Sequence, residues 1–215
     1  MALVCVTGPI GAGKSSLVGP LAQRLDARAC REDNNANPAY AAAFDDPAQW
    51  AFEAELTFVV LSLESWTRAR RSRAAAVLER CPADNAEIFG ASRFAHGEIS
   101  SRQHEILERC AGLAPALGAV PDLVVLLGVP ANLALERVRL RNEPGEEHYT
   151  GQYLHEIGER YVEWGRAWTA SPVMTIDTAK EDVRVPGTVD KIATEARSIL
   201  PGLAASSASS PKRRL

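Results

Sequence analysis

Residues 8–15 read Gly-Pro-Ile-Gly-Ala-Gly-Lys-Ser and match the phosphate-binding pattern Gly-x-x-x-x-Gly-Lys-Ser/Thr in full. An apolar run rich in β-branched residues, 2–7, precedes the pattern, and Leu17, Leu21 and Leu25 follow it at helical spacing. The stretch therefore predicts a strand, a glycine-rich loop and a helix, in that order. Backbone N–H groups of such a loop, together with the positive end of the helix dipole, surround phosphate oxygens.

This loop predicts a nucleotide ligand, and we expect ATP together with Mg²⁺. Lys14 is expected to reach the β- and γ-phosphates, and the Ser15 hydroxyl is expected to be a magnesium ligand. The residues expected to contact ATP are Gly8, Pro9, Ile10, Gly11, Ala12, Gly13, Lys14, Ser15 and Ser16.

Outward from the loop, strand-like and helix-like segments alternate, which is typical of a three-layer α/β sandwich with a parallel sheet. Further strands are predicted at 27–31, 74–78, 123–129 and 173–176, and further helices at 47–73, 86–113, 132–141, 152–168 and 189–200. The polar stretch 142–150 suits a mobile flap. We expect one folded domain over 1–200 with a five-stranded sheet, and a disordered, basic, Ala/Ser-rich tail over 201–215.

Composition narrows the classes of function. The 215 residues are 46% hydrophobic and 24% charged, and no apolar run is long enough for a membrane span. A net charge of −3 argues against a nucleic-acid-binding protein. The N-terminus lacks the basic region and cleavage site of a secretory signal, so we expect a cytoplasmic protein with no membrane partner. The four cysteines form no Cys-x-x-Cys pair, which favours reduced thiols over zinc ligands.

Acidic residues follow two of the predicted strands. Glu32 comes after the second strand, and Glu79 and Arg80 come after the third. Ligand sites in parallel sheets lie beyond the carboxyl ends of the strands, so these side chains are candidates for the site. No guanine-reading Asn/Thr-Lys-x-Asp motif is present, and no predicted strand ends in the usual Walker B aspartate.

Four landmarks, in order and spacing, resemble the deoxynucleoside kinase family, which includes bacterial deoxyadenosine and deoxyguanosine kinases. They are the loop 8–15, Glu32 five residues before Asn37-Pro38, the segment 46–52 with Glu55, and Glu79-Arg80 followed by 86–89. The similarity continues through the basic helix 137–141 and the pattern Tyr153-Leu154, Tyr161 and Trp164, and it spans residues 2–178. It implies a nucleoside-kinase-like fold with an arginine-bearing lid, and a homodimer.

The resemblance implies transfer of the ATP γ-phosphoryl group to the 5′-hydroxyl of a nucleoside. Glu32 would be the general base, because an ionised carboxylate within hydrogen-bond reach makes the hydroxyl a better nucleophile. Glu79 would help to hold Mg²⁺, and Arg80 would stabilise the charge that develops on the phosphoryl group. Arg137 and Arg141, one helical turn apart, would be lid residues over the phosphates. The catalytic residues implied are thus Glu32, Arg80, Lys14, Arg137 and Arg141, and the metal-binding residues are Ser15 and Glu79.

The resemblance also implies an acceptor pocket, lined by Glu32, Phe44, Trp50, Glu55, Phe58, Ser62, Arg80, Asn85 and Glu146. Glu55 stands where many members have a glutamine, and a carboxylate only accepts hydrogen bonds, which favours a purine such as guanine. Ser62 and Asn85 stand where the family usually has an arginine–aspartate pair, so we expect a neutral pair there. Phe44 replaces the tyrosine expected at the sugar 3′-hydroxyl, while Glu146 matches the flap acid. Phosphate machinery is thus retained and substrate recognition altered, which favours a purine nucleoside or a modified analogue.

Two other functions remain open from the sequence. One is a kinase that acts on a small alcohol other than a nucleoside. The other is a noncatalytic nucleotide-binding subunit, in which the altered pocket reflects lost substrate binding. Val59, Val60 and Leu63 could lie in a dimer interface or in the core.

Overall fold

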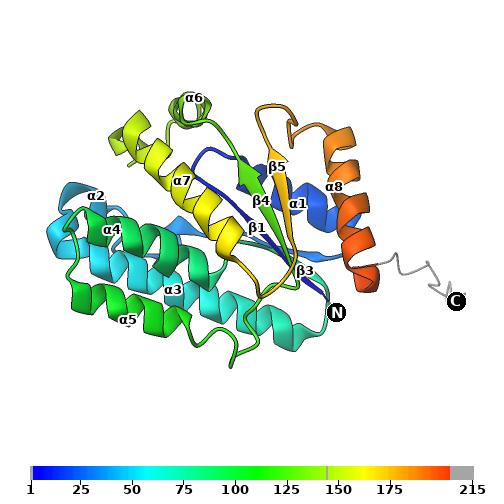
Figure 1. The fold of residues 1–215 in the computed structure, drawn as a ribbon, viewed down its shortest axis with the longest axis horizontal. Coiled ribbons are helices and arrows are strands. Elements are labelled where there is room, and N and C mark those ends of the chain that lie inside the picture. The colour runs from blue at the N-terminus through cyan, green and yellow to red at the C-terminus, as the bar shows by residue number, and fades with distance from the viewer. Residues whose placement is uncertain (1, 144, 204–215) are drawn as a thin grey trace, which may run out of the picture.

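Five parallel strands form one sheet in the order β2-β3-β1-β4-β5 (Figure 1). The structure is a computed structural model and describes residues 2–143 and 145–203. The strands are β1 Leu3–Thr7, β2 Arg28–Cys30, β3 Ala76–Glu79, β4 Leu123–Gly128 and β5 Val173–Asp177. The helices are α1 Lys14–Arg24, α2 Ala42–Asp45, α3 Pro47–Ser72, α4 Ala91–Ala95, α5 Ser101–Ala111, α6 Ala131–Arg141, α7 Gly151–Ala167 and α8 Pro186–Ile199. The predicted α/β fold with a five-stranded parallel sheet is confirmed.

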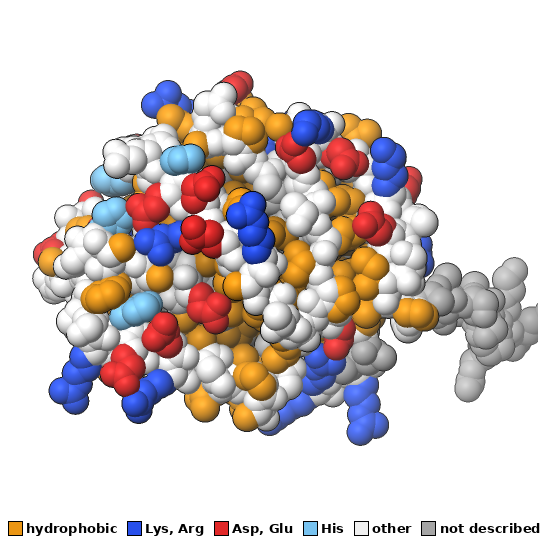
Figure 2. Space-filling view, in the orientation of Figure 1, with side chains coloured by type: hydrophobic (Ala, Val, Ile, Leu, Met, Phe, Trp, Pro, Cys, Tyr) orange, Lys and Arg blue, Asp and Glu red, His pale blue; other side chains and the backbone are white. Residues whose placement is uncertain are grey.

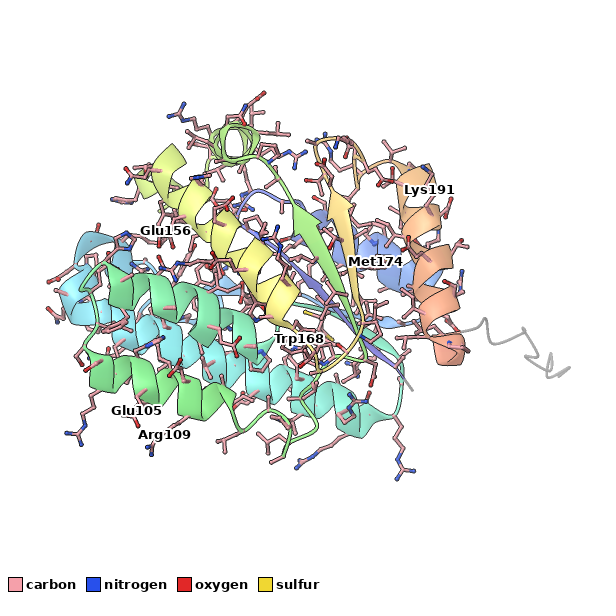
Figure 3. All side chains as sticks on the ribbon, in the orientation of Figure 1. Glu105, Arg109, Glu156, Trp168, Met174 and Lys191 are labelled. Atoms are coloured by element: carbon pink, nitrogen blue, oxygen red, sulfur yellow. The ribbon has the colours of Figure 1, made fainter. Side chains whose placement is uncertain are left out.

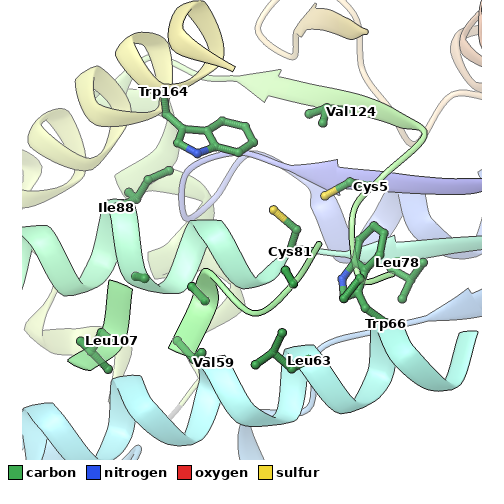
Figure 4. Close-up of a cluster of buried hydrophobic side chains, with 14 of the residues drawn as sticks. Cys5, Val59, Leu63, Trp66, Leu78, Cys81, Ile88, Leu107, Val124 and Trp164 are labelled. Atoms are coloured by element: carbon green, nitrogen blue, oxygen red, sulfur yellow. The ribbon is translucent and has the colours of Figure 1, made fainter. Parts of the chain in front are cut away.

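Helices cover both faces of the sheet, which explains why β1 and β4 are continuous apolar runs. On one face α1 and α8 pack through Leu17, Leu21 and Ile192. On the other face α3, α5 and α7 enclose a second cluster, part of which is drawn in Figure 4 around Trp66 and Trp164. Among the residues that the structure describes, no helix is both long and apolar enough to cross a membrane.

The long helix α3 matches its predicted bounds, 47–73, to within one residue. The Asp46 side chain caps its start by accepting a hydrogen bond from the Gln49 backbone N–H at 3.2 Å, and Pro47 occupies the first turn. Val59 and Leu63 are buried in the core, whereas Val60 is exposed. The structure therefore removes Val59 and Leu63 from the dimer interface considered for them.

The continuous helix predicted over 86–113 is wrong, because the structure breaks it into pieces. Residues Asp84–Gly90 form a short π-helix that leads into α4, and α5 begins only at Ser101. Gly97 takes a left-handed φ of 72° between them, and Ser100 with Gln103 forms a capping box that starts α5. Both signals are present in the sequence, and the break separates α4 from α5.

The folded region extends beyond the expected boundary at residue 200. Residues Pro201–Leu203 form a 3₁₀ turn, and Leu203 is buried in the cluster between the sheet, α1 and α8. Leu203 therefore belongs to the core, whereas Pro201 and Gly202 of the same turn are exposed. The rest of that tail, 204–215, lies outside the described residues, so its expected disorder stays a prediction.

Replacing Leu203 by Ala tests this boundary. We expect Leu203→Ala to lower the free energy of unfolding by about 2–3 kcal/mol, because a buried leucine loses its packing and leaves a cavity. Leu140→Ala is the matched control, since Leu140 on α6 is 79% exposed, and its effect should stay within about 0.5 kcal/mol. Denaturant unfolding measures both values, and equal effects of the two substitutions would place Leu203 outside the core.

Candidate active site at the carboxyl ends of the strands

A cleft with a volume of about 1060 Å³ opens at the carboxyl ends of β2, β3 and β1. The strand order explains its composition, because the loop after β1, Glu32 after β2 and Glu79-Arg80 after β3 follow neighbouring strands. Of the expected site residues, those that line the cleft are Ile10, Gly11, Lys14, Ser15, Ser16, Glu32, Phe44, Glu55, Phe58, Glu79, Arg80, Asn85, Arg141 and Glu146.

The glycine-rich loop has a backbone that requires glycine. Gly8 has φ 141°, and a Cβ there would lie 2.2 Å from the carbonyl oxygen of Leu127. Gly11 has φ 78°, and its Cβ would lie 2.8 Å from the carbonyl oxygen of Ala134. Gly13, also left-handed, precedes the first residue of α1, so the N-terminal N–H groups of an 11-residue helix face the loop. This is the geometry that phosphate groups need.

Lys14 lies over this loop and is almost fully buried. Its ammonium group donates hydrogen bonds to the carbonyl oxygens of Gly8 and Pro9, both at 2.9 Å. Burial, together with the nearby Arg80 guanidinium, lowers the pKa of Lys14 to about 7. A phosphate in the loop would supply the negative charge that restores its protonated form.

Ser15 and Glu79 meet at the base of the cleft. The Ser15 hydroxyl donates to Glu79 Oε1 at 2.7 Å, while the second oxygen, Oε2, is buried and has no hydrogen-bond partner within the described residues. A buried carboxylate oxygen without a partner is costly, and a hydroxyl with a carboxylate is the oxygen donor set that Mg²⁺ prefers. These two residues therefore fit a magnesium ion, as the sequence predicts.

Glu32 and Arg80 form an ion pair at the wall of the cleft, with 2.8 Å between Arg80 Nε and Glu32 Oε2. Burial raises the pKa of Glu32, although the Arg80 charge opposes that rise. Arg80 has φ 59°, a conformation that costs a non-glycine residue on the order of 1 kcal/mol. Its guanidinium lies 4.4 Å from the centre of the Phe89 ring and donates to the Tyr161 hydroxyl at 2.8 Å. The pair is thus held rigidly at the strand ends.

A buried layer of polar groups supports Arg80 from below. The carboxylate of Asp84, which is fully buried, accepts hydrogen bonds from the hydroxyls of Thr7 and Tyr161 and from the Cys81 thiol. Because Tyr161 also accepts from Arg80, this layer connects the first strand to the arginine. Asp84 lies beside Asn85 in sequence and was not predicted to have a role.

The part of the cleft around Phe44 contains two tyrosine hydroxyls that the sequence analysis does not single out. The hydroxyls of Tyr40 and Tyr149 lie 3.5 Å apart, and both rings pack edge-on against Phe44. Glu146 is paired with Arg141, whose Nε donates to Glu146 Oε2 at 3.1 Å. Phe44 is therefore surrounded by tyrosines that offer the polar group it lacks.

At the inner end of the cleft, Glu55 pairs with an arginine that the sequence did not predict. Arg93 Nε donates to Glu55 Oε1 at 3.2 Å, and Arg93 Nη1 donates to Glu98 Oε2 at 2.7 Å. The neutral Ser62–Asn85 pair expected here is absent from the described structure. Asn85 lines the cleft, but Ser62 lies in a separate cavity of about 160 Å³ behind Phe58.

Two further residues, one expected in the acceptor pocket and one expected in the lid, do not line the cleft. Trp50 packs against Ala39, Ala43 and Ala54, outside the acceptor pocket. Arg137 donates to the Gly11 carbonyl oxygen at 3.1 Å and to the Thr178 hydroxyl and carbonyl oxygens at 3.0 and 2.8 Å. It therefore ties the phosphate loop to the segment after β5, whereas Arg141 alone of the two lid arginines reaches the cleft.

Comparisons with known proteins agree with this geometry. The family model described as deoxynucleoside kinase matches residues 4–201. A deoxyguanosine kinase of Lactobacillus acidophilus is 28% identical over 190 residues, covering 85% of this chain and 83% of the relative. A deoxyadenosine/deoxycytidine kinase of Bacillus subtilis is 23% identical over 200 residues, covering 89% and 92%. A solved structure of deoxyadenosine kinase from M. mycoides, with the products dCMP and dCDP bound, superposes with a TM-score of 0.77 at 17% identity, covering 92% of this chain and 100% of that one, and so supports the fold.

Proposed function

The chain belongs to the deoxynucleoside kinase family, and from that premise we propose that it transfers the γ-phosphoryl group of ATP to the 5′-hydroxyl of a purine deoxynucleoside. The observation that carries this proposal is that three groups of residues line one cleft. The phosphate loop with Lys14, the Ser15–Glu79 pair and the Glu32–Arg80 pair all lie at the carboxyl ends of adjacent strands. Phosphoryl transfer needs a phosphate-binding loop, a magnesium site, and groups that activate the acceptor and stabilise the transferred charge.

The donor side of the reaction is the phosphate loop. The N–H groups at the start of α1 and the Lys14 ammonium bind the β- and γ-phosphates and draw charge away from the bond that breaks. Ser15 and Glu79 would hold Mg²⁺, which neutralises phosphate charge when bound. Arg141, at the end of α6, approaches the cleft from the lid and adds a further cation.

The acceptor side consists of Glu32 and Arg80. Glu32 accepts the proton of the 5′-hydroxyl as the oxygen attacks, and its raised pKa makes it a stronger base than an exposed glutamate. Arg80 orients Glu32 in the absence of substrate, and its guanidinium is close enough to the phosphate loop residues to stabilise charge on the phosphoryl group as it moves.

The acceptor that fits the remaining lining is a purine deoxynucleoside. Tyr40 and Tyr149 supply hydroxyls beside Phe44, which supports an ordinary deoxyribose over the modified sugar that Phe44 alone favours. A carboxylate, Glu55, faces the inner end, where the base would lie. The deoxyguanosine kinase named above supports the purine preference, and the deoxyadenosine/deoxycytidine kinase is named for a purine and a pyrimidine nucleoside.

A homodimer is also proposed for this family member. Exposed apolar side chains on α3 and α5, Val60 and Ile106, lie on neighbouring helices and suit such an interface. The cytoplasmic location expected from the sequence stays a prediction that no described feature tests.

The proposed function is tested by incubating the protein with Mg²⁺, γ-labelled ATP and a panel of acceptors. The panel contains the four deoxynucleosides, arabinosyl purines, and alcohols that are not nucleosides. Label is expected in the monophosphates of the purine deoxynucleosides first. Transfer only to a non-nucleoside alcohol, or ATP binding with no transfer to any acceptor, would contradict the proposal and favour one of the two other functions.

ATP binding is expected to take up a proton. With a pKa of about 7, Lys14 is mostly neutral at pH 8 in the free protein, and bound phosphates favour its charged form. Binding at pH 8 should therefore take up close to one proton, and affinity should fall as the pH rises above 7. Titration calorimetry in buffers of different ionisation enthalpy measures the uptake. If ATP binding to the Lys14→Met variant took up the same number of protons, another group would be the one that is protonated.

A further inference from the structure

Three charged side chains form a chain at the inner end of the cleft. Arg93 of α4 lies between Glu55 of α3 and Glu98, which follows α4, at 3.2 Å and 2.7 Å. The Glu55 side chain is 7% exposed and that of Arg93 is 16% exposed, so solvent screens the pair little. Glu55, Arg93 and Glu98 together carry two negative charges and one positive charge, so the group has a net negative charge at the cleft.

Asn85 lines the same cleft, and one of its polar atoms has no partner among the described residues. It is 2% exposed, and its side-chain amide nitrogen, Nδ2, has no hydrogen-bond partner within the described residues. A buried amide donor without a partner is costly in a folded protein. A ligand with an acceptor at this place would satisfy it.

We propose that Arg93, anchored by Glu98, is a positioning residue that keeps Glu55 charged and aimed at the nucleobase, and that Glu55 and Asn85 together select a guanine-type edge. The proposal rests on the proposed function, since it identifies the base that the same cleft accepts. Neither Arg93 nor Glu98 occupies a position at which the sequence predicted a role.

The match to guanine follows from donor and acceptor order. The Watson–Crick edge of guanine presents two adjacent N–H donors, at N2 and N1, followed by the O6 acceptor. A carboxylate can accept both donors while one of its oxygens still accepts from Arg93, because each oxygen has two lone pairs. The Asn85 amide donor then meets O6. Adenine presents an acceptor at N1, which faces the carboxylate unfavourably.

Arg93 is needed because of where Glu55 lies. Burial raises the pKa of Glu55, and Arg93 opposes that rise. The other charged or titratable groups near Glu55 are Arg80, Glu32, Glu98, His96 and Tyr153. Without Arg93, a larger fraction of Glu55 is protonated, and a protonated carboxyl group no longer accepts hydrogen bonds from both N–H donors.

The test compares four nucleosides as acceptors. Deoxyguanosine has all three groups, deoxyinosine lacks the 2-amino group, and the 2,6-diaminopurine and adenine deoxynucleosides lack both O6 and the N1–H. The wild-type kcat/KM should fall in the order guanine, hypoxanthine, then the two 6-amino purines. A higher kcat/KM for deoxyadenosine than for deoxyguanosine would overturn the proposal.

Arg93→Met should lower kcat/KM for deoxyguanosine by about 10- to 100-fold, mostly through KM, and change that for deoxyadenosine by less than about threefold. Arg93→Lys should recover part of the guanine preference, because it restores a charge beside Glu55. Groups that act on both substrates, such as Glu32, affect both kcat/KM values equally, so their effect cancels in the ratio of the two values. In Arg93→Met the fall of this ratio at low pH should begin at a higher pH than in the wild type.

Arg109→Met is the matched control, because Arg109 pairs with Glu105 on the exposed side of α5 (Figure 3) and should leave the ratio unchanged. If Arg93→Met fails to fold, as judged by its melting temperature, Glu98→Gln carries the test with Arg93 intact and should lower the same ratio. An unchanged ratio in a folded Arg93 variant, or equal losses for both nucleosides, would overturn the inference while leaving the kinase function in place. Failure of the function itself differs, since the wild type would then phosphorylate no nucleoside.

Discussion

Glu32→Gln lowers kcat by about a thousandfold and changes the affinity for ATP by less than about threefold. The substitution keeps the shape of the side chain and removes its ability to take a proton from the 5′-hydroxyl. It also removes the charge that pairs with Arg80 at 2.8 Å. ATP affinity should persist because the phosphate loop follows β1, on the other side of β3 from Glu32.

Single-turnover kinetics measures the chemical step, and titration of ATP measures binding. Glu159→Gln is the matched control, because Glu159 lies exposed on α7 and its replacement should leave kcat unchanged. A Glu32→Gln enzyme with more than about a tenth of the wild-type kcat would assign the base to another group and remove Glu32 from the mechanism.

Lys14→Met lowers kcat/KM by at least about a thousandfold. Lys14 is the buried cation of the phosphate loop, and a methionine of similar length keeps its packing without its charge. The γ-phosphoryl group then loses a hydrogen-bond donor and a positive charge in a site with little solvent screening. Unlike Glu32→Gln, this variant should also weaken ATP binding, because Lys14 contacts the donor and not the acceptor.

The matched control is Lys191→Met, since Lys191 lies on α8 with its side chain 78% exposed (Figure 3). Steady-state rates with varied ATP and with varied nucleoside measure both variants. Retention of the wild-type transfer rate in Lys14→Met would contradict the role given to Lys14 in phosphoryl transfer.

The donor half of the site could be predicted from the sequence because its determinants are local. The loop 8–15, its strand and its helix are contiguous, and Glu32, Glu79 and Arg80 each follow a strand directly. In a parallel sheet the carboxyl ends meet at one edge, so position in sequence decides position in space. The structure brings these residues to one cleft, as expected.

The acceptor half could not be predicted in the same way, because its residues come from separate elements. Arg93 contacts Glu55 from α4, and its partner Glu98 lies in the break of the helix predicted over 86–113, which Gly97 and the Ser100 capping box signal. Tyr40 and Tyr149 are 109 residues apart and meet beside Phe44 through tertiary packing. The family resemblance predicts that Ser62 pairs with Asn85, yet Ser62 lines the smaller cavity.

The net charge of −3 suits a protein that binds small anions at one site, and Figure 2 shows acidic and basic side chains interspersed over the face formed by α3, α4, α5 and α7. The cleft contains both signs of charge as well, because Lys14, Arg31, Arg80, Arg93 and Arg141 line it together with a larger number of carboxylates. Arg80, Arg93 and Arg141 each form an ion pair with a carboxylate of the cleft. Lys14 bonds to backbone carbonyls, which leaves its charge for the phosphates.

The most direct test of the account is the rate of label transfer from γ-labelled ATP to deoxyguanosine, compared with 2′,5′-dideoxyguanosine, which lacks only the 5′-hydroxyl. We predict Mg²⁺-dependent formation of labelled deoxyguanosine 5′-monophosphate and no labelled product from the dideoxy compound. Equal labelling of both nucleosides, or of neither while purine deoxynucleosides and ATP bind, would contradict transfer to the 5′-hydroxyl.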